Sequence, residues 1–208
     1  MFNNKLRLLL GLVLLLGCTY TIARRVFLPV DNETVTLPIL SSIPPFELVD
    51  QQAQPFTSAN LKEGIWLVDF FFTTCPSICP MMTQKMLKIH RRYRKRVPFH
   101  TLSITVNPAY DSPARLKEYA ESYRIENDDK WYFLTGEEKK IHRLAWEGFK
   151  VGSKTELADH SSYFILVDDQ LQIRGYYDSN DQHVMKKLNR EIEFLLAEVS
   201  KTETDKGS

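Results

Sequence analysis

Two cysteines, Cys75 and Cys79, stand in the stretch FFFTTCPSICPMM (residues 70–82), separated by three residues and each followed by a proline. The chain holds three cysteines, so most of its thiols lie in one place. Two thiols at this spacing can form a reversible disulfide, supply a nucleophile or bind a soft metal ion. A purely structural disulfide would contribute little, because closing so short a loop constrains the unfolded chain weakly.

The elements on either side of the pair favour a reactive thiol. Residues 64–72, GIWLVDFFF, form an almost continuous apolar run, which predicts a strand buried on both faces. A helix is predicted to begin near Pro76, so the thiols lie at its N-terminus, where unpaired amides and the helix dipole favour the thiolate. Side chains at 75 and 79 then face the same way, one helical turn apart.

A metal site built on this pair would need a further ligand, and the chain has five histidines. His160 differs from the others because it follows Asp159 in a polar loop, LADHSSYF, that leads into a predicted strand. Sites in α/β proteins gather where loops meet strand ends. The other four histidines have structural interpretations, as surface residues of helices, as a strand residue and as a helix start: His90, His142, His100 and His183.

The rest of the chain alternates predicted strands with predicted helices. Further strands are expected at 99–106 and 131–134, and a hairpin at 162–177. The helix that begins near Pro76 is expected to continue through 82–96, and further helices are expected at 111–123, 137–149 and 184–199. The helix at 111–123 has Ser112 as its N-cap and Pro113 as its first residue. This order predicts the α/β class, with a central mixed sheet flanked by helices.

The overall composition is that of an ordinary globular protein. The 208 residues are 43% apolar and 25% charged, and the formal net charge of +1 gives no field that would attract nucleic acid. Four segments are predicted: a membrane anchor or lipoprotein-type signal at 1–28, a linker at 29–43, one folded domain at 44–199 and a disordered tail at 200–208. The basic run at 88–96 is interpreted as a solvated helix face.

The N-terminus carries an uncharged apolar run, Leu8–Ala23, with basic residues on both sides. As a helix it would span about 24 Å, and flanking arginines can extend its reach to the membrane interface. The run also fits an export signal, and LLGC (15–18) resembles a lipoprotein cleavage site with Cys18 as the lipidated residue. We therefore expect a membrane-anchored protein whose soluble domain is extracytoplasmic, on the bacterial periplasmic side or its equivalent.

Four motifs in this order and spacing resemble the Sco/SenC family of membrane-anchored copper proteins: TTCPSICP (73–80), VNPAYDSP (106–113), LTG (134–136) and DHSSYFILVDD (159–169). The resemblance runs from about residue 44 to 197. It implies a thioredoxin-like fold in which Cys75, Cys79 and His160 bind copper, with Asp159 as the neighbour of the histidine ligand.

The chemistry of these residues agrees with the implied ligands. Two thiolates and an imidazole suit three-coordinate Cu(I), while Cu(II) would take a further ligand such as water or Asp159. The same donors also bind Zn²⁺, so residue types alone leave the metal open. Asn107 departs from the family pattern, which has Asp at this position. Either the loss of this charge alters the electrostatics near the site, or the change is an isosteric replacement in a surface loop, which is the interpretation we favour.

The resemblance implies a chaperone that delivers copper to the dinuclear copper site of cytochrome c oxidase during assembly. Its partner would be the copper-bearing oxidase subunit or another copper chaperone. The alternative is a thiol–disulfide oxidoreductase that keeps partner cysteines reduced, using the same two sulfurs. His160 discriminates between the two, since a pure oxidoreductase has no need of it. A peroxiredoxin-type peroxidase, which uses one activated thiol beside an arginine, is disfavoured by the two-cysteine loop.

Overall fold

The computed structural model describes residues 17, 37–96, 98–126, 130–152 and 161–206. From Leu37 onward the chain forms one compact unit with its own core. Among the residues described, no helix combines the length and the apolar character needed to cross a membrane. The apolar run predicted as an anchor, Leu8–Ala23, lies outside the described residues apart from Gly17.

A six-stranded mixed sheet forms the centre of the domain, in the order β1-β8-β7-β4-β5-β6. Its middle strands are β4 (Ile65–Phe71) and β5 (Phe99–Thr105), which pair in parallel and are buried at every residue, as their apolar sequences predict. The other strands are β1 (Ser41–Ser42), β6 (Trp131–Leu134), β7 (Tyr163–Val167) and β8 (Gln172–Asp178). Parallel β6 joins β5, whereas β7, β8 and β1 are each antiparallel to their neighbour.

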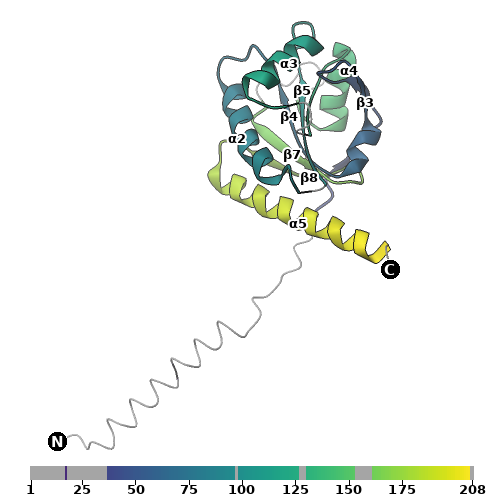
Figure 1. Ribbon diagram of the computed structural model, residues 1–208, viewed down its shortest axis with the longest axis vertical. Coiled ribbons are helices and arrows are strands. Elements are labelled where there is room, and N and C mark those ends of the chain that lie inside the picture. The colour runs from purple at the N-terminus through teal and green to yellow at the C-terminus, as the bar shows by residue number, and fades with distance from the viewer. Residues whose placement is uncertain (1–16, 18–36, 97, 127–129, 153–160, 207–208) are drawn as a thin grey trace, which may run out of the picture. The chain divides into compact units, whose positions relative to one another are not determined.

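Helices cover both faces of this sheet (Figure 1). Three of them pack on one face: α2 (Ile78–Tyr93), α3 (Pro113–Ser122) and α5 (Gln182–Lys206). The opposite face carries η1 (Ser58–Glu63), α4 (Glu138–Arg143), its π-helical continuation η2 (Leu144–Gly148) and a hairpin of β2 (Glu47–Val49) with β3 (Pro55–Thr57). The predicted α/β class with a mixed, helix-flanked sheet is therefore confirmed.

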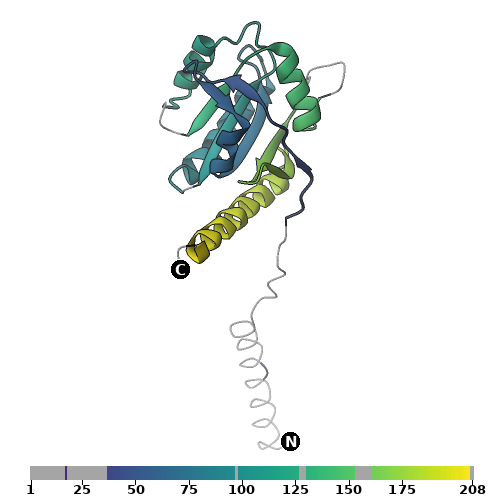
Figure 2. The same cartoon turned by 90° about the vertical axis from the view of Figure 1, so that its right-hand side faces the viewer.

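The folded domain starts earlier and its last helix ends later than the sequence predicts. Leu37 and Ile43 are buried, and Arg174 of β8 donates to the Leu37 carbonyl at 2.6 Å, so the segment predicted as linker up to residue 43 pairs with β8. Helix α5 runs to Lys206 instead of giving way to a disordered tail at 200 (Figure 2). Once a helix is nucleated, each further residue adds a backbone hydrogen bond without needing an apolar face.

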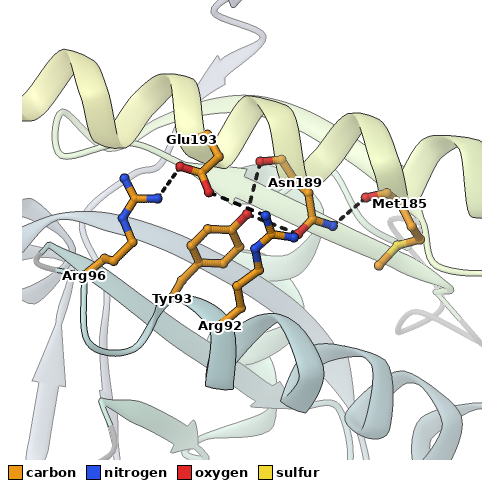
Figure 3. A network of polar contacts seen from close by, with 6 residues as sticks. All are labelled: Arg92, Tyr93, Arg96, Met185, Asn189 and Glu193. Atoms are coloured by element: carbon orange, nitrogen blue, oxygen red, sulfur yellow. Dashed lines mark hydrogen bonds and ion pairs between the residues drawn. The ribbon is translucent and has the colours of Figure 1, made fainter.

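Helix α2, which carries Cys79, is joined at its C-terminal end to α5 (Figure 3). The Tyr93 hydroxyl donates to the carbonyl and side-chain oxygens of Asn189, at 3.3 and 3.2 Å. Beside it, Glu193 forms ion pairs with Arg92 and Arg96. The ion pairs are exposed and contribute little, so at this end of α2 the buried Tyr93 ring and its hydroxyl contribute more to the contact with α5.

The segments that form the site meet at one end of the sheet, where strands β4 and β5 finish and strand β7 begins. Strand β4 ends at Phe71, opposite Thr105 at the end of parallel β5. Strand β7 runs antiparallel to β4, so it begins with Tyr163 at the same edge. The loop that carries the two cysteines therefore leaves the sheet where the segment after His160 enters it.

Candidate metal centre

The two cysteines come together at the junction between β4 and α2. Cys75 lies in the connecting loop, and Cys79 is the second residue of α2, which begins at Ile78 and not at the predicted Pro76. Both are free thiols, with exposed fractions of 5% and 4%. The Cys79 backbone N–H donates to the Cys75 sulfur at 3.4 Å. The predicted juxtaposition at a helix N-terminus is present, in a largely dehydrated setting.

The helix N-terminus makes Cys75 the more acidic thiol. Burial raises the pKa of Cys75, but hydrogen bonds from the Cys79 thiol and from the backbone amides of Ser77, Cys79 and Ile78 outweigh it and leave the pKa below its usual value. These amides are the ones that a helix leaves without intrahelical acceptors at its first turn. A thiolate at Cys75 is thus stabilised by the Cys79 thiol and by the backbone amides of the first turn.

Cys79 has the opposite tendency. Burial raises the pKa of Cys79 to about 12, and its hydrogen bond to Cys75, the charge of Cys75 and the charge of Asp69 add to the rise. Cys75 is therefore the thiol of the pair that ionises first, while Cys79 keeps its proton at neutral pH. A metal ion that bound both sulfurs would displace this second proton, because coordinated thiols are deprotonated.

Asp111, which the sequence analysis did not single out, anchors the cysteine loop. Its buried carboxylate accepts hydrogen bonds from the Thr73 backbone amide at 3.1 Å, from the Thr73 hydroxyl, and from the Thr105 hydroxyl at 2.5 Å. Asn107, the residue that departs from the family pattern, accepts from the Asp111 amide at 2.9 Å through its carbonyl. This contact uses only the backbone, so the side chain at 107 can change without breaking it.

A second polar chain supports Cys79 from within α2. The Thr83 hydroxyl donates to the Cys79 carbonyl at 2.9 Å and lies 2.8 Å from the hydroxyl of Tyr119 on α3. Burial raises the pKa of Tyr119, which keeps that hydroxyl neutral. Helices α2 and α3 are thereby joined directly beside the dithiol.

Asp69 is a buried carboxyl group beneath the site that the sequence analysis also passed over. It lies in the centre of β4 with 1% of its surface exposed, and its Oδ1 has no hydrogen-bond partner among the described residues. Burial raises its pKa to about 7, against a smaller lowering by a hydrogen bond from Ser103. A lone acid inside the apolar run GIWLVDFFF was the available signal.

The prediction for His90 was wrong, and the prediction for His160 is not tested. His90 was expected at a helix surface, but it is 1% exposed, with Nδ1 2.9 Å from the Thr101 hydroxyl. It follows Cys79 by eleven residues, or about 16 Å of helix, so it cannot share a metal with that sulfur. His160 and Asp159 lie outside the described residues.

The described residues supply two ligands of the predicted site. Within 37–96, 98–126, 130–152 and 161–206, no three His, Cys, Asp or Glu side chains are arranged to hold a metal ion. The dithiol itself fits soft metals, because thiolates select Cu(I) or Zn²⁺ over Mg²⁺ or Ca²⁺. Its burial also fits a low coordination number, since few water ligands could enter.

The fold and the site define a class of protein. It is an α/β domain with a mixed sheet and a buried dithiol, which lies between strand β4 and helix α2 near the start of antiparallel strand β7. The chain belongs to the SCO1/SenC family, whose sequence profile matches residues 39–193. The family membership inferred from the motifs is therefore confirmed, and with it the thioredoxin-like fold.

Relatives with known sequences span most of the domain. A SCO1 protein homolog of Bacillus subtilis is 34% identical over 136 residues, which cover 62% of this chain and 70% of the relative. A SCO2-like protein of Rickettsia felis is 33% identical over 155 residues, covering 69% and 73%.

Solved structures agree with the architecture. BsSco, described with a disulfide switch and as a member of the Sco family of cytochrome c oxidase assembly proteins, is 26% identical with a TM-score of 0.69, covering 79% of this chain and 99% of that one. Yeast Sco1 with copper bound is 28% identical with a TM-score of 0.59, covering 72% and 88%.

Proposed function

We propose that this chain is a membrane-tethered copper chaperone that delivers copper to the dinuclear copper site of cytochrome c oxidase during assembly. The observation that carries the proposal is the pair of buried thiols, with the Cys79 amide 3.4 Å from the Cys75 sulfur. Two relatives support it: yeast Sco1 has been solved with copper bound, and BsSco belongs to a family of oxidase assembly proteins.

In this proposal copper is the cargo, and its ligands are Cys75, Cys79 and His160. Cys75 ionises more readily than an ordinary thiol, because hydrogen bonds from the Cys79 thiol and from the first amides of α2 lower its pKa. Cys79 binds as a thiolate only by releasing its proton to solvent, so uptake of copper releases protons. The low exposure of both sulfurs excludes most water, which favours a site of two sulfurs and one nitrogen.

A second candidate function, thiol–disulfide exchange with a partner's cysteines, is favoured by the unequal acidities of the two thiols. A low-pKa thiol attacks or leaves readily, and a protonated neighbour can resolve the mixed disulfide. The disulfide switch described for BsSco supports this possibility for a relative. Both functions use Cys75 and Cys79, so replacing either cysteine does not separate them.

His160→Ala separates the two functions. The variant should lose most of its copper affinity, because one of three ligands is gone, while Cys75 and Cys79 should still oxidise to a disulfide at the wild-type rate. Copper affinity is measured by competition with a chromophoric Cu(I) chelator, and oxidation by loss of thiols. Cys75→Ser is the matched control, since it should lose both properties. Wild-type copper affinity in His160→Ala would exclude His160 as a ligand.

In cells, a strain that carries only His160→Ala should fail to assemble active cytochrome c oxidase at low external copper. Excess copper must be avoided because it can bypass a weak chaperone. Protein abundance is measured alongside, so that degradation is not mistaken for lost delivery. Normal oxidase activity at low copper would overturn the chaperone function and favour the oxidoreductase, which needs only the two sulfurs.

Cys18→Ser tests the proposed tether and its separation from the site. Copper stoichiometry should remain that of the wild type, because Cys18 precedes the folded domain by almost twenty residues. Release of the variant from membranes would identify a lipid anchor on Cys18, and retention would identify an apolar helix. A fall in copper stoichiometry would contradict the separation.

A further inference from the structure

The carboxylate of Asp111 is buried, with 0% of the residue exposed, yet it is not among the proposed copper ligands. Its Oδ2 accepts from the Thr73 amide at 3.1 Å and from the Thr105 hydroxyl at 2.5 Å, and its Oδ1 accepts from the Thr73 hydroxyl. No ion pair of Asp111 occurs among the residues that the structure describes. Three hydrogen bonds therefore carry the stabilisation of this buried group.

The three donors come from two segments that are distant in sequence. Thr105 is the last residue of β5, while Thr73 follows β4 and stands two residues before Cys75. Asp111 is itself held in place, because its amide donates to the Asn107 carbonyl at 2.9 Å. A single carboxylate thus joins the loop after β5 to the loop that carries the cysteines.

The hydrogen bonds between Thr73 and Asp111 hold the cysteine loop firmly, because breaking them would leave a buried carboxylate without most of its donors. If Thr73 moved away, the buried carboxylate would lose two of its three hydrogen-bond donors, which costs free energy. Cys75 follows almost immediately, and its own amide donates to the Phe72 carbonyl at 3.2 Å. The segment from Phe72 to Cys75 is therefore held at both ends.

We propose that Asp111 is a positioning residue for the dithiol: through Thr73 it holds the Cys75 sulfur against the first turn of α2, so that both sulfurs converge on one metal ion. The copper part of this inference rests on the proposed function. The effect on the metal-free dithiol does not, because it concerns only the geometry of the loop. Residues that orient ligands from outside typically change metal affinity by about 10–100-fold.

Asp111→Asn is the primary test, made in the full chain in non-ionic detergent with Cys18→Ser, so that only two thiols remain. Asparagine keeps the size of the side chain but can accept at only one oxygen, so at least one Thr73 donor loses its acceptor. In the metal-free protein, Cys75 and Cys79 should be alkylated by iodoacetamide at least several-fold faster. With Cu(I), competition against a chromophoric chelator should show about 10–100-fold weaker binding.

Thr73 supplies a milder variant and a rescue. Thr73→Val removes the hydroxyl donor but retains the backbone amide, so it should change both measurements in the same direction and by less. Thr73→Ser retains the hydroxyl and should restore wild-type behaviour. The double variant Asp111→Asn with Thr73→Val should resemble Asp111→Asn alone, because both changes interrupt one interaction. If Asp111→Asn does not fold, the two Thr73 variants decide the question.

Asp168→Asn is the matched control. Asp168 is also a buried aspartate that accepts two backbone amides, from Gln170 and Gln172 at 2.9 Å each, and it pairs with Arg174. It stands after β7, at the opposite edge of the sheet from the cysteine loop. Its replacement should lower the stability of the domain while leaving alkylation of folded protein and copper affinity unchanged.

Wild-type alkylation rates and copper affinity in Asp111→Asn would overturn the proposal. Equal changes in Asp168→Asn would overturn it as well, because the effect would then be general destabilisation. If the wild type binds no copper but Asp111→Asn still accelerates alkylation, the positioning role stands and the proposed function fails. The two failures are therefore distinguishable.

Discussion

Replacing Asp69 with asparagine should change how the stability of the domain depends on pH. Asp69 is 1% exposed, and burial raises its pKa from 3.8 to about 7, with Ser103 opposing that rise by a hydrogen bond. The folded state therefore holds the proton more tightly than the unfolded state. The stabilising contribution is complete below about pH 4 and is lost as the pH rises through about 7.

The size of the effect follows from the two pKa values. A shift of about three units corresponds to about 4 kcal/mol over the whole titration, and about 2–3 kcal/mol of this falls between pH 5 and pH 8. Asparagine carries no titrating proton. The difference in unfolding free energy between Asp69→Asn and the wild type should therefore shift in favour of the variant by about 2–3 kcal/mol between those pH values.

In the wild type, the titration of His90 changes the unfolding free energy with pH in the opposite direction to that of Asp69. The difference in unfolding free energy between variant and wild type is therefore more informative than the pH dependence of either protein alone. Burial, with smaller contributions from the charges of Arg94, Arg91 and His100, lowers the pKa of His90 from 6.5 to about 4. The contribution of His90 to the unfolding free energy is complete above about pH 6.5 and is lost as the pH falls toward 4. About 2 kcal/mol of this contribution is already lost at pH 5. The two residues nearly cancel, and the wild type should show a weak dependence over this range.

The assay is urea unfolding of residues 37–208, the compact unit, reduced and free of copper, at pH 5 and pH 8. The unfolding free energy of Asp69→Asn should rise from pH 5 to pH 8, because only the titration of His90 remains. The unfolding free energy of His90→Gln should fall over the same range, because only the titration of Asp69 remains. A difference between Asp69→Asn and the wild type that is the same at both pH values would refute the reasoning, whatever its absolute size.

Two further predictions concern the thiols and the backbone. Brief treatment with limiting iodoacetamide at pH 7 should label Cys75 before Cys79, because the pKa of Cys75 is lowered while that of Cys79 is raised to about 12; peptide mass spectrometry measures the order, and equal labelling would contradict it. Gly64→Ala should destabilise the domain by about 1–3 kcal/mol in thermal unfolding, because its Cβ would lie 2.1 Å from the Pro98 carbonyl oxygen. A melting temperature equal to that of the wild type would show that this backbone contact relaxes freely.

Local pattern was sufficient for most elements of the fold. The apolar run at 64–72 became β4, and Ser112 with Pro113 began α3, with the Ser112 hydroxyl accepting from the Arg115 amide as an N-cap does. These features depend on neighbours within a few residues, so the sequence states them directly. The start of α2 was misplaced by two residues, because Ser77 makes no side-chain cap there and only backbone geometry sets the boundary.

The sequence by itself determined the thiol pair and its place between a strand and a helix, because the apolar run before it and the helical pattern after it are local features of the chain. The tertiary structure decided what surrounds that pair. Asp111 reaches Thr73 across 38 positions, and His90 is buried because the Trp131 ring of β6 packs against it. Such contacts depend on how strands are ordered in the sheet, and no local spacing records that order.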